Sequence, residues 1–160
     1  MLTQGSFRQT EVKLKRFVKL LAERTFQPVG QACIRTLFQT TEPIHHIPED
    51  SLFSPVGDAT EWGGDGMYGW FKADYIVPEE LDGKALFLYP RIGFYEATLW
   101  VNGRIHSNYA AKFTEGSHGN HYCNRITANA KAGEHFDFAL ECYAYHDMPG
   151  TMPLVTEDWK

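Results

Sequence analysis

Apolar and polar positions alternate along most of the chain after Trp62, and this period of two predicts β-strands. The stretch "GWFKADYIVP" ends at Pro78, "KALFLYP" follows a turn at Asp82-Gly83, and "HFDFALECYAY" begins at His135. Such strands recur about every 10 to 15 residues, which is typical of an antiparallel sandwich.

The clearest local signal is the stretch "ATLWVNGRIH", residues 97–106. Three apolar residues, 99–101, lead directly into Asn102-Gly103. This dipeptide supplies the two positive-φ positions that a two-residue hairpin turn requires. We therefore expect a β-hairpin here, and its turn is explained by geometry without any contact to a ligand.

An apolar stripe at helical spacing predicts one α-helix over residues 8–25. Thr10 is placed to cap the start of this helix. Most of the basic residues lie off the stripe, whose members are Val12, Phe17, Leu20, Leu21 and Arg24. The stripe needs a surface to lie on, and two alternatives stay open. The helix packs on its own domain, or it acts as a strut against a neighbouring domain.

These elements divide the chain into four parts. Residues 1–28 form an N-terminal helical segment, and residues 29–60 form an irregular, proline-containing connection with one strand. Residues 61–150 form the sandwich, and residues 151–160 begin a linker. The expected fold class is all-β, an antiparallel β-sandwich preceded by an α-helix.

Composition and charge limit the classes of protein to which this chain can belong. Hydrophobic residues make up 43% of the 160 residues and charged residues 22%, as in a soluble globular domain. The net charge of −5 argues against a nucleic-acid partner, which requires a basic surface. No stretch has the apolar character of a signal peptide or a membrane span, so we expect a cytoplasmic protein with no membrane partner.

The three cysteines, Cys33, Cys123 and Cys142, lack the spacing of a disulfide framework. They therefore favour free thiols in a reducing compartment. Cys142 ends an alternating run and is expected in the core. A bridge between Cys123 and Cys142 is the alternative.

No motif predicts catalysis or a bound metal. The chain lacks a G-x-S-x-G elbow, a phosphate loop and the HExxH or CxxC frame of a zinc site. His118 and His121 lie in a glycine-rich loop and could bind zinc or nickel together with Glu115 or His106, but polar loops commonly carry histidines. The two catalytic carboxylates of a glycosidase are brought together only by the fold, so the sequence does not exclude such a pair. We expect no catalytic residue, cofactor or metal ion in this chain.

A glycine-rich aromatic stretch, "EWGGDGMYGWF", is the strongest candidate for ligand contact. It interleaves Trp62, Tyr68 and Trp70 with Asp65 and four glycines. Sugar sites combine an aromatic plate for the C–H face of the ring with a carboxylate or amide for its hydroxyls. The alternative is that the tryptophan only anchors the loop to the core.

Short motifs follow one another in a specific order between about residues 60 and 147. They are a Trp-Gly-Gly loop, a strand ending in Val-Pro, Asp-Gly-Lys, Val-Asn-Gly, Asn-His, Ala-Lys-Ala-Gly-Glu, and a strand ending near Glu-Cys-Tyr-Ala. This series resembles the non-catalytic N-terminal region of glycoside hydrolase family 38 α-mannosidases, in their cytosolic and bacterial branch. It is also similar to the galactose-binding-like jelly roll of β-galactosidase-type enzymes. The Asn-His step is Asn120-His121, and the insertion "SNYAAKFTEGS" before it departs from the family pattern.

The resemblance implies a jelly-roll sandwich that precedes a zinc-dependent catalytic domain beginning near Lys160. We expect the chain itself to be inactive, zinc to belong only to the missing catalytic domain, and the sandwich to pack against that domain of the same polypeptide. The implied ligands are mannose-type glycans. The candidate carbohydrate-binding or interface residues are Trp62, Asp65, Tyr68, Trp70, Asn120 and His121. Two alternatives remain: a stand-alone carbohydrate-binding module, and self-association through an exposed apolar surface.

Overall fold

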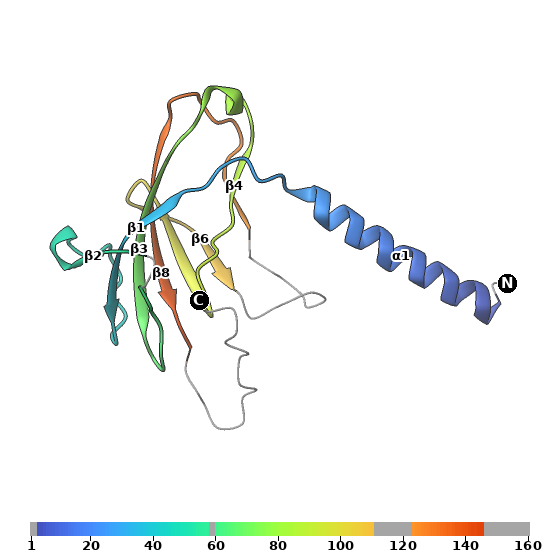
Figure 1. The fold of residues 1–160 in the computed structure, drawn as a ribbon, viewed down its shortest axis with the longest axis horizontal. Helices are drawn as coiled ribbons and strands as arrows, with labels where there is room; N and C mark the ends of the chain where they lie inside the picture. Colours follow the sequence, from blue (N-terminus) through green and yellow to red (C-terminus); the bar gives the residue numbers. More distant parts are fainter. Residues whose placement is uncertain (1–2, 58–59, 111–122, 146–160) are drawn as a thin grey trace. The chain divides into compact units, whose positions relative to one another are not determined.

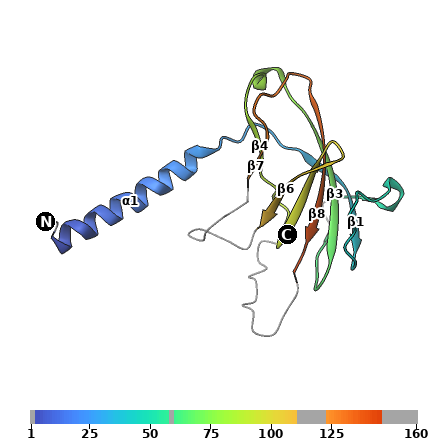
Figure 2. The same cartoon turned by 180° about the vertical axis from the view of Figure 1, so that it is seen from behind.

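The computed structural model describes residues 3–57, 60–110 and 123–145. The chain divides into two compact units, residues 1–31 and residues 32–160. Figures 1 and 2 show helix α1 in the first unit and a β-sandwich in the second, from opposite sides. The predicted all-β class with an N-terminal helix is confirmed.

Helix α1 spans Gln4–Thr25 and begins four residues before the predicted helix. Its N-cap is Thr3, whose hydroxyl accepts a hydrogen bond from the backbone N–H of Ser6. The prediction that Thr10 caps the helix is wrong, because Thr10 lies inside it and donates its hydroxyl to the carbonyl of Ser6. The apolar pattern missed the first turn since residues 4–6 are Gln, Gly and Ser, which do not continue a stripe.

Five apolar side chains of α1 form a stripe, which we call the α1 stripe. At 3.6 residues per turn its members fall within about 100° of arc. They are 50% to 63% exposed: Phe7, Leu14, Phe17, Val18 and Leu21. The sequence analysis also placed Val12, Leu20 and Arg24 on the stripe. Val12 lies on the opposite side of the helix, and Leu20 and Arg24 lie beside the stripe, outside its arc. No helix in the described part of the chain combines the length and hydrophobicity needed to cross a bilayer.

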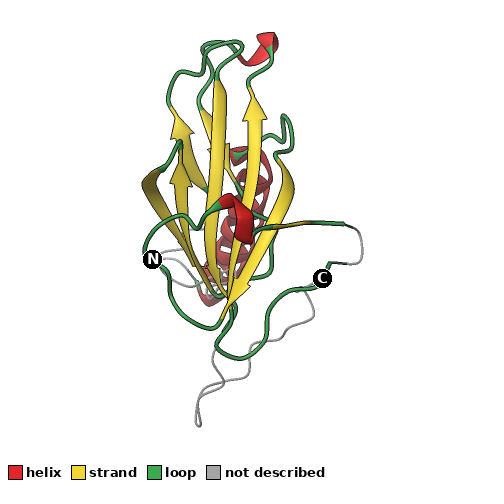
Figure 3. Ribbon diagram, turned by 90° about the vertical axis from the view of Figure 1, so that its left-hand side faces the viewer, coloured by secondary structure: helices red, strands yellow, loops and turns green. Residues whose placement is uncertain are grey.

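The sandwich consists of a six-stranded antiparallel sheet and a two-stranded antiparallel sheet (Figure 3). The order in the large sheet is β2-β1-β3-β8-β5-β6. Its strands are β1 (Cys33–Thr40), β2 (Ser54–Pro55), β3 (Tyr68–Ile76), β5 (Glu96–Val101), β6 (Arg104–Ala110) and β8 (His135–Tyr143). The small sheet pairs β4 (Leu86–Leu88) with β7 (Asn124–Thr127). Short 3-10 helices, η1 (Asp50–Leu52) and η2 (Glu79–Leu81), lie in the connections.

Strand β1 lies within residues 29–60, which the sequence analysis described as a connection with one strand. It is the strand that the sequence predicted there, but it lies inside the large sheet, between β2 and β3. Only Leu37 of β1 is buried, so the strand does not show a strong apolar alternation. Pro43 follows the strand closely, and this proline made the region look irregular in the sequence.

Alternation along β8 separates the core from the outer face of the large sheet. Phe136, Phe138, Leu140 and Cys142 point into the core, where the side chain of Leu99 from β5 is also fully buried. Burial of this apolar surface is the main favourable term in folding. Cys142 is completely buried, as predicted, and all three cysteines are free thiols.

The hairpin turn has the predicted geometry. Asn102 has a φ of 50° and Gly103 a φ of 76°, the two left-handed positions of the turn. Asn102 is also tied to β8, because its N–H donates to the carbonyl of Asp137 and its side-chain oxygen accepts from the N–H of Asp137, both at 2.9 Å. The turn therefore contributes to sheet assembly as well as to chain reversal.

Trp62 anchors its loop to the core. Its ring meets Phe71 edge-on, with the ring centroids 5.0 Å apart. It also lies over Gly69, where an added Cβ atom would come within 2.7 Å of Trp62 Cε3. Glycine is therefore required at position 69 by the close approach of the indole.

We expect Gly69→Ala to lower the free energy of unfolding by about 1–3 kcal/mol, because the new methyl group collides with a packed aromatic ring. Gly57→Ala is the matched control, since a Cβ atom there would meet no atom within 4 Å. Urea unfolding followed by tryptophan fluorescence measures both variants. Equal stabilities of the two variants would contradict this role of Trp62.

Candidate functional site

The outer face of the large sheet carries most of the polar and aromatic groups that could meet a ligand. Figure 3 views the sheet from this side, with η1 in front of the strands. Because β3, β8 and β5 are neighbours in register, their outward side chains form cross-strand rows. From one end of the sheet to the other the rows are Tyr68–Tyr143–Glu96, Trp70–Glu141–Thr98, Lys72–Ala139–Trp100 and Asp74–Asp137.

The middle rows are covered by the segment of residues 41–53. The N–H of Ile44 donates to the Glu141 carboxylate, and the charge of His45 also acts on that carboxylate. The rings of Phe53 and Phe38 lie 6.0 Å apart. Trp70 lies on the outer face of the sheet, yet it is 0% exposed. The contacts of the segment of residues 41–53 explain how it is shielded from solvent.

Trp70 packs against Trp100 beneath this covering, with their ring centroids 6.1 Å apart. Both indole N–H groups are buried and lack an acceptor among the described residues. The two rings therefore contribute through apolar packing rather than through hydrogen bonds, and Trp70 is inaccessible to a ligand in this structure.

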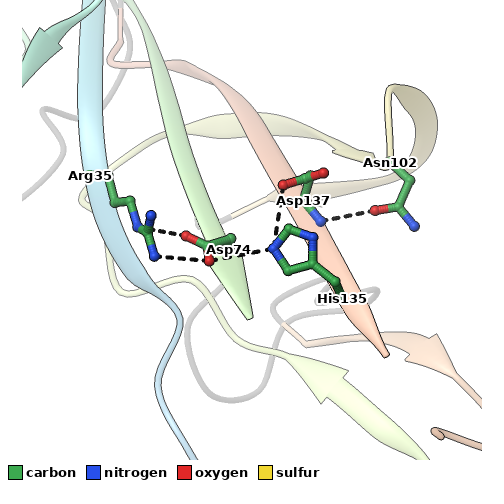
Figure 4. A network of polar contacts seen from close by, with 5 residues as sticks. All are labelled: Arg35, Asp74, Asn102, His135 and Asp137. Carbon is green, nitrogen blue, oxygen red and sulfur yellow. Dashed lines mark hydrogen bonds and ion pairs between the residues drawn. The ribbon is translucent and has the colours of Figure 1, made fainter. Parts of the chain in front are cut away.

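One end of the outer face holds a charged network (Figure 4). Arg35 donates to Asp74 through Nε at 2.6 Å and through Nη2 at 3.0 Å. His135 Nε2 lies 3.5 Å from Asp74 and 3.7 Å from Asp137. Figure 4 also shows the side chain of Asn102 joined to the backbone of Asp137.

Arg35, Asp74, His135 and Asp137 also line an open hollow of about 370 Å³. Lys72, Asp50 and Phe53 complete its wall, with Thr36 and Ala73. Lys72 pairs with Asp50 and lies 4.1 Å from the centre of the Phe53 ring. The two permanent cations of the hollow, Arg35 and Lys72, are thus each paired with a carboxylate, and an anionic ligand would have to compete with those pairs. In residues 3–57, 60–110 and 123–145, no three His, Cys, Asp or Glu side chains are placed to hold a metal ion.

The other end of the outer face holds what we call the tyrosine cluster: Tyr68, Tyr95, Tyr143, Asp65 and Glu96. The rings of Tyr68 and Tyr143 are 4.9 Å apart and tilted, and Tyr95 meets Tyr143 edge-on at 6.5 Å. The three rings are half-buried, while both carboxylates are exposed. Partial burial raises the pKa of Tyr143, and the negative charges of Asp65 and Glu96 act in the same direction.

The structure brings together two of the six residues selected from the sequence. Asp65 and Tyr68 lie in the tyrosine cluster, whereas Trp62 packs on the core and Trp70 is covered. The remaining two, Asn120 and His121, lie outside the described residues.

Sequence reasoning missed Tyr95, Tyr143 and Glu96. Alternation in the β8 stretch could have placed Tyr143 on the outer side, because it shares the parity of Asp137. Its position between Tyr68 and Glu96 depends on strand pairing, for which the sequence carries no local signal.

No protein-family model matches the chain, and no curated protein matches it by sequence. Similar solved structures include β-glucuronidases of Faecalibacterium prausnitzii (14% identity, TM-score 0.47) and Ruminococcus gnavus (14%, TM-score 0.48). Each match covers 74% of this chain and 22% of the enzyme. A β-D-glucuronidase of Dictyoglomus thermophilum is 11% identical, with a TM-score of 0.42, over 78% of this chain and 23% of that one.

The chain therefore spans less than a quarter of the length of these enzymes. They are glycoside hydrolases, the broad class of the sequence resemblance, but β-glucuronidases rather than α-mannosidases. At this identity and TM-score the likeness carries no argument about activity or substrate.

Glu141 provides a test of the covering segment. Burial raises the pKa of its carboxyl, although the N–H of Ile44 and the charge of His45 act in the opposite direction. A carboxyl whose pKa is higher in the folded than in the unfolded state favours folding at low pH, and this contribution is lost as the pH rises through the folded pKa. We therefore expect the stability of Glu141→Gln relative to wild type to increase from pH 4 to pH 7.

Urea unfolding at several pH values measures this difference in the free energy of unfolding. Glu42→Gln, at an exposed position in the same segment, is the control. A difference for Glu141→Gln that stays flat or decreases with pH would show that the carboxyl is not buried by the segment.

Proposed function

We propose that this chain is the non-catalytic sandwich domain of an α-mannosidase-type glycoside hydrolase, and that α1 docks on the catalytic part of the same polypeptide. The zinc ion and the mannose-type substrate belong to that catalytic part, and the location is cytoplasmic. The class of enzyme is supported by the ordered motifs, and those within the described residues lie in one sandwich. The Asp82-Gly83 step follows η2, Asn102-Gly103 joins β5 to β6, and residues 131–134 form the turn before β8.

The α1 stripe is the observation that carries the docking role. Five large apolar side chains on one face of a 22-residue helix are each at least half exposed. Burying one such side chain contributes about 1.5–3 kcal/mol, so a partner surface for the stripe would contribute substantially to stability. Contiguous exposed apolar surface of this kind marks interaction sites.

Charge specifies the chemistry of the partner surface. Helix α1 contains six Lys and Arg residues but only two Glu residues, and all six cations lie off the stripe. The remainder of the chain is acidic, with 9 of the 15 Lys and Arg and 18 of the 20 Asp and Glu. We propose a partner groove that is apolar along its floor and acidic along its rim.

A stand-alone carbohydrate-binding module is the second candidate function. The tyrosine cluster favours it, because aromatic rings flanked by carboxylates are the groups that recognise a sugar ring.

The reading frame beyond the codon for Lys160 tests the first candidate. We expect it to continue into a glycosidase catalytic domain, and the longer protein to release mannose from α-mannosides. A stop codon at that point would overturn the proposal, and the second candidate would then take its place.

Within the longer protein, we expect Leu14→Gln to expose α1 to trypsin. Glutamine keeps the helix propensity of leucine but loses about 2 kcal/mol of apolar burial, so cleavage within α1 is expected to accelerate at least tenfold. Val12→Gln also replaces an exposed apolar residue by glutamine, but on the opposite side of the helix, and is expected to cleave as wild type. Equal cleavage rates of the two variants would rule out docking through the stripe.

A further inference from the structure

The tyrosine cluster sits where three strands of the large sheet end or begin. Tyr68 starts β3, Tyr143 ends β8, and Glu96 starts β5. Tyr143 is the centre of the row, paired in register with Tyr68 on one side and with Glu96 on the other. Tyr95 adds a third ring, perpendicular to that of Tyr143.

The backbone holds these side chains in place. The N–H of Tyr95 donates to the carbonyl of Tyr143 at 2.8 Å. Gly66 donates to the carbonyl of Tyr145 at 2.7 Å, and Asp65 forms a β-bridge with Tyr145. A surface that is already ordered loses little conformational entropy when a ligand binds.

The chemistry of the cluster matches a sugar ring. Tyrosine combines a flat apolar ring, on which the C–H groups of a pyranose can lie, with a hydroxyl that can exchange hydrogen bonds with the sugar. The carboxylates of Asp65 and Glu96 accept hydrogen bonds from sugar hydroxyls. Charged hydrogen-bonding groups beside aromatic rings are typical of small-molecule sites.

The charge of the cluster limits the class of sugar. Both ionisable groups beside the three rings are acids, and the charges that act on the Tyr143 hydroxyl include no cation among the described residues. A uronic acid or a phosphorylated sugar would bring a negative charge close to two carboxylates, which is unfavourable. A neutral sugar meets no such repulsion.

We infer that the tyrosine cluster is a binding site for a neutral hexopyranose, with Tyr143 as its stacking platform and Asp65 and Glu96 as acceptors for the sugar hydroxyls. This inference deepens the second candidate function and does not depend on the first. It also concerns a different site from the charged hollow at the other end of the sheet, which is lined by Arg35, Lys72 and their paired carboxylates.

The test is a titration of the full 160-residue chain followed by NMR. The probes are methyl α-mannopyranoside, methyl β-galactopyranoside and sodium glucuronate. We expect one or both neutral glycosides to bind with millimolar affinity and to shift resonances of the cluster. Glucuronate is expected to bind at least tenfold more weakly than the better neutral glycoside.

Variants distinguish the cluster from the rest of the surface. Tyr143→Ala is expected to weaken neutral-sugar binding about tenfold, the equivalent of one aromatic contact of about 1.4 kcal/mol. Tyr143→Phe keeps the ring and is expected to retain most of the affinity. Tyr89→Ala removes a 55% exposed tyrosine that follows β4 and is expected to bind as wild type.

Asp65→Asn tests the same site without disturbing the packing, because Asp65 is exposed. It is expected to weaken binding of the neutral sugar several-fold, so a folding defect in Tyr143→Ala would not leave the question open. The inference is overturned if neither neutral glycoside binds, if glucuronate binds as tightly as they do, or if folded Asp65→Asn and Tyr143→Ala both bind the neutral glycoside as wild type. None of these outcomes affects the first candidate function, which the reading frame beyond Lys160 tests separately.

Discussion

The antiparallel pairing of β3 with β8 is the contact on which the rest of the structure depends. It runs without a break from Tyr68 opposite Tyr143 to Ile76 opposite His135. In this register Phe71 of β3 and Phe136, Phe138, Leu140 and Cys142 of β8 point to the core, and every outward side chain of β3 meets an outward partner on β8. A slip of one residue would place Phe138 and Leu140 on the outer face, so burial of the core enforces the register.

This register also determines how the outer face is divided. The charged network and the tyrosine cluster lie at opposite ends of the same two strands, and the segment of residues 41–53 covers the rows between them. The network ties β1, β3 and β8 together through Arg35, Asp74 and His135, and the Arg35 guanidinium is paired with the Asp74 carboxylate. The cluster instead presents aromatic rings beside two exposed carboxylates, which gives it the character of a binding surface.

Much of the fold was predictable from the sequence, but only some of the residues of the tyrosine cluster were. The hairpin, the strand into Val77-Pro78 and the buried Cys142 followed from local patterns. The aromatic loop pointed to Asp65 and Tyr68, yet it also pointed to Trp62 and Trp70, which the fold places elsewhere. The start of α1 was misplaced because capping by Thr3 depends on backbone geometry that an apolar stripe does not report.

The sequence by itself determined the features whose causes lie within a few residues. Asn and Gly tolerate the positive φ angles that the turn at 102–103 requires, and alternation in β8 separates an inner from an outer side. Only the tertiary structure decided which outer residues meet. Tyr143 reaches Tyr68 across 75 residues of chain, and Trp70 is buried by a separate segment, because strand pairing and loop packing join positions that share no local pattern.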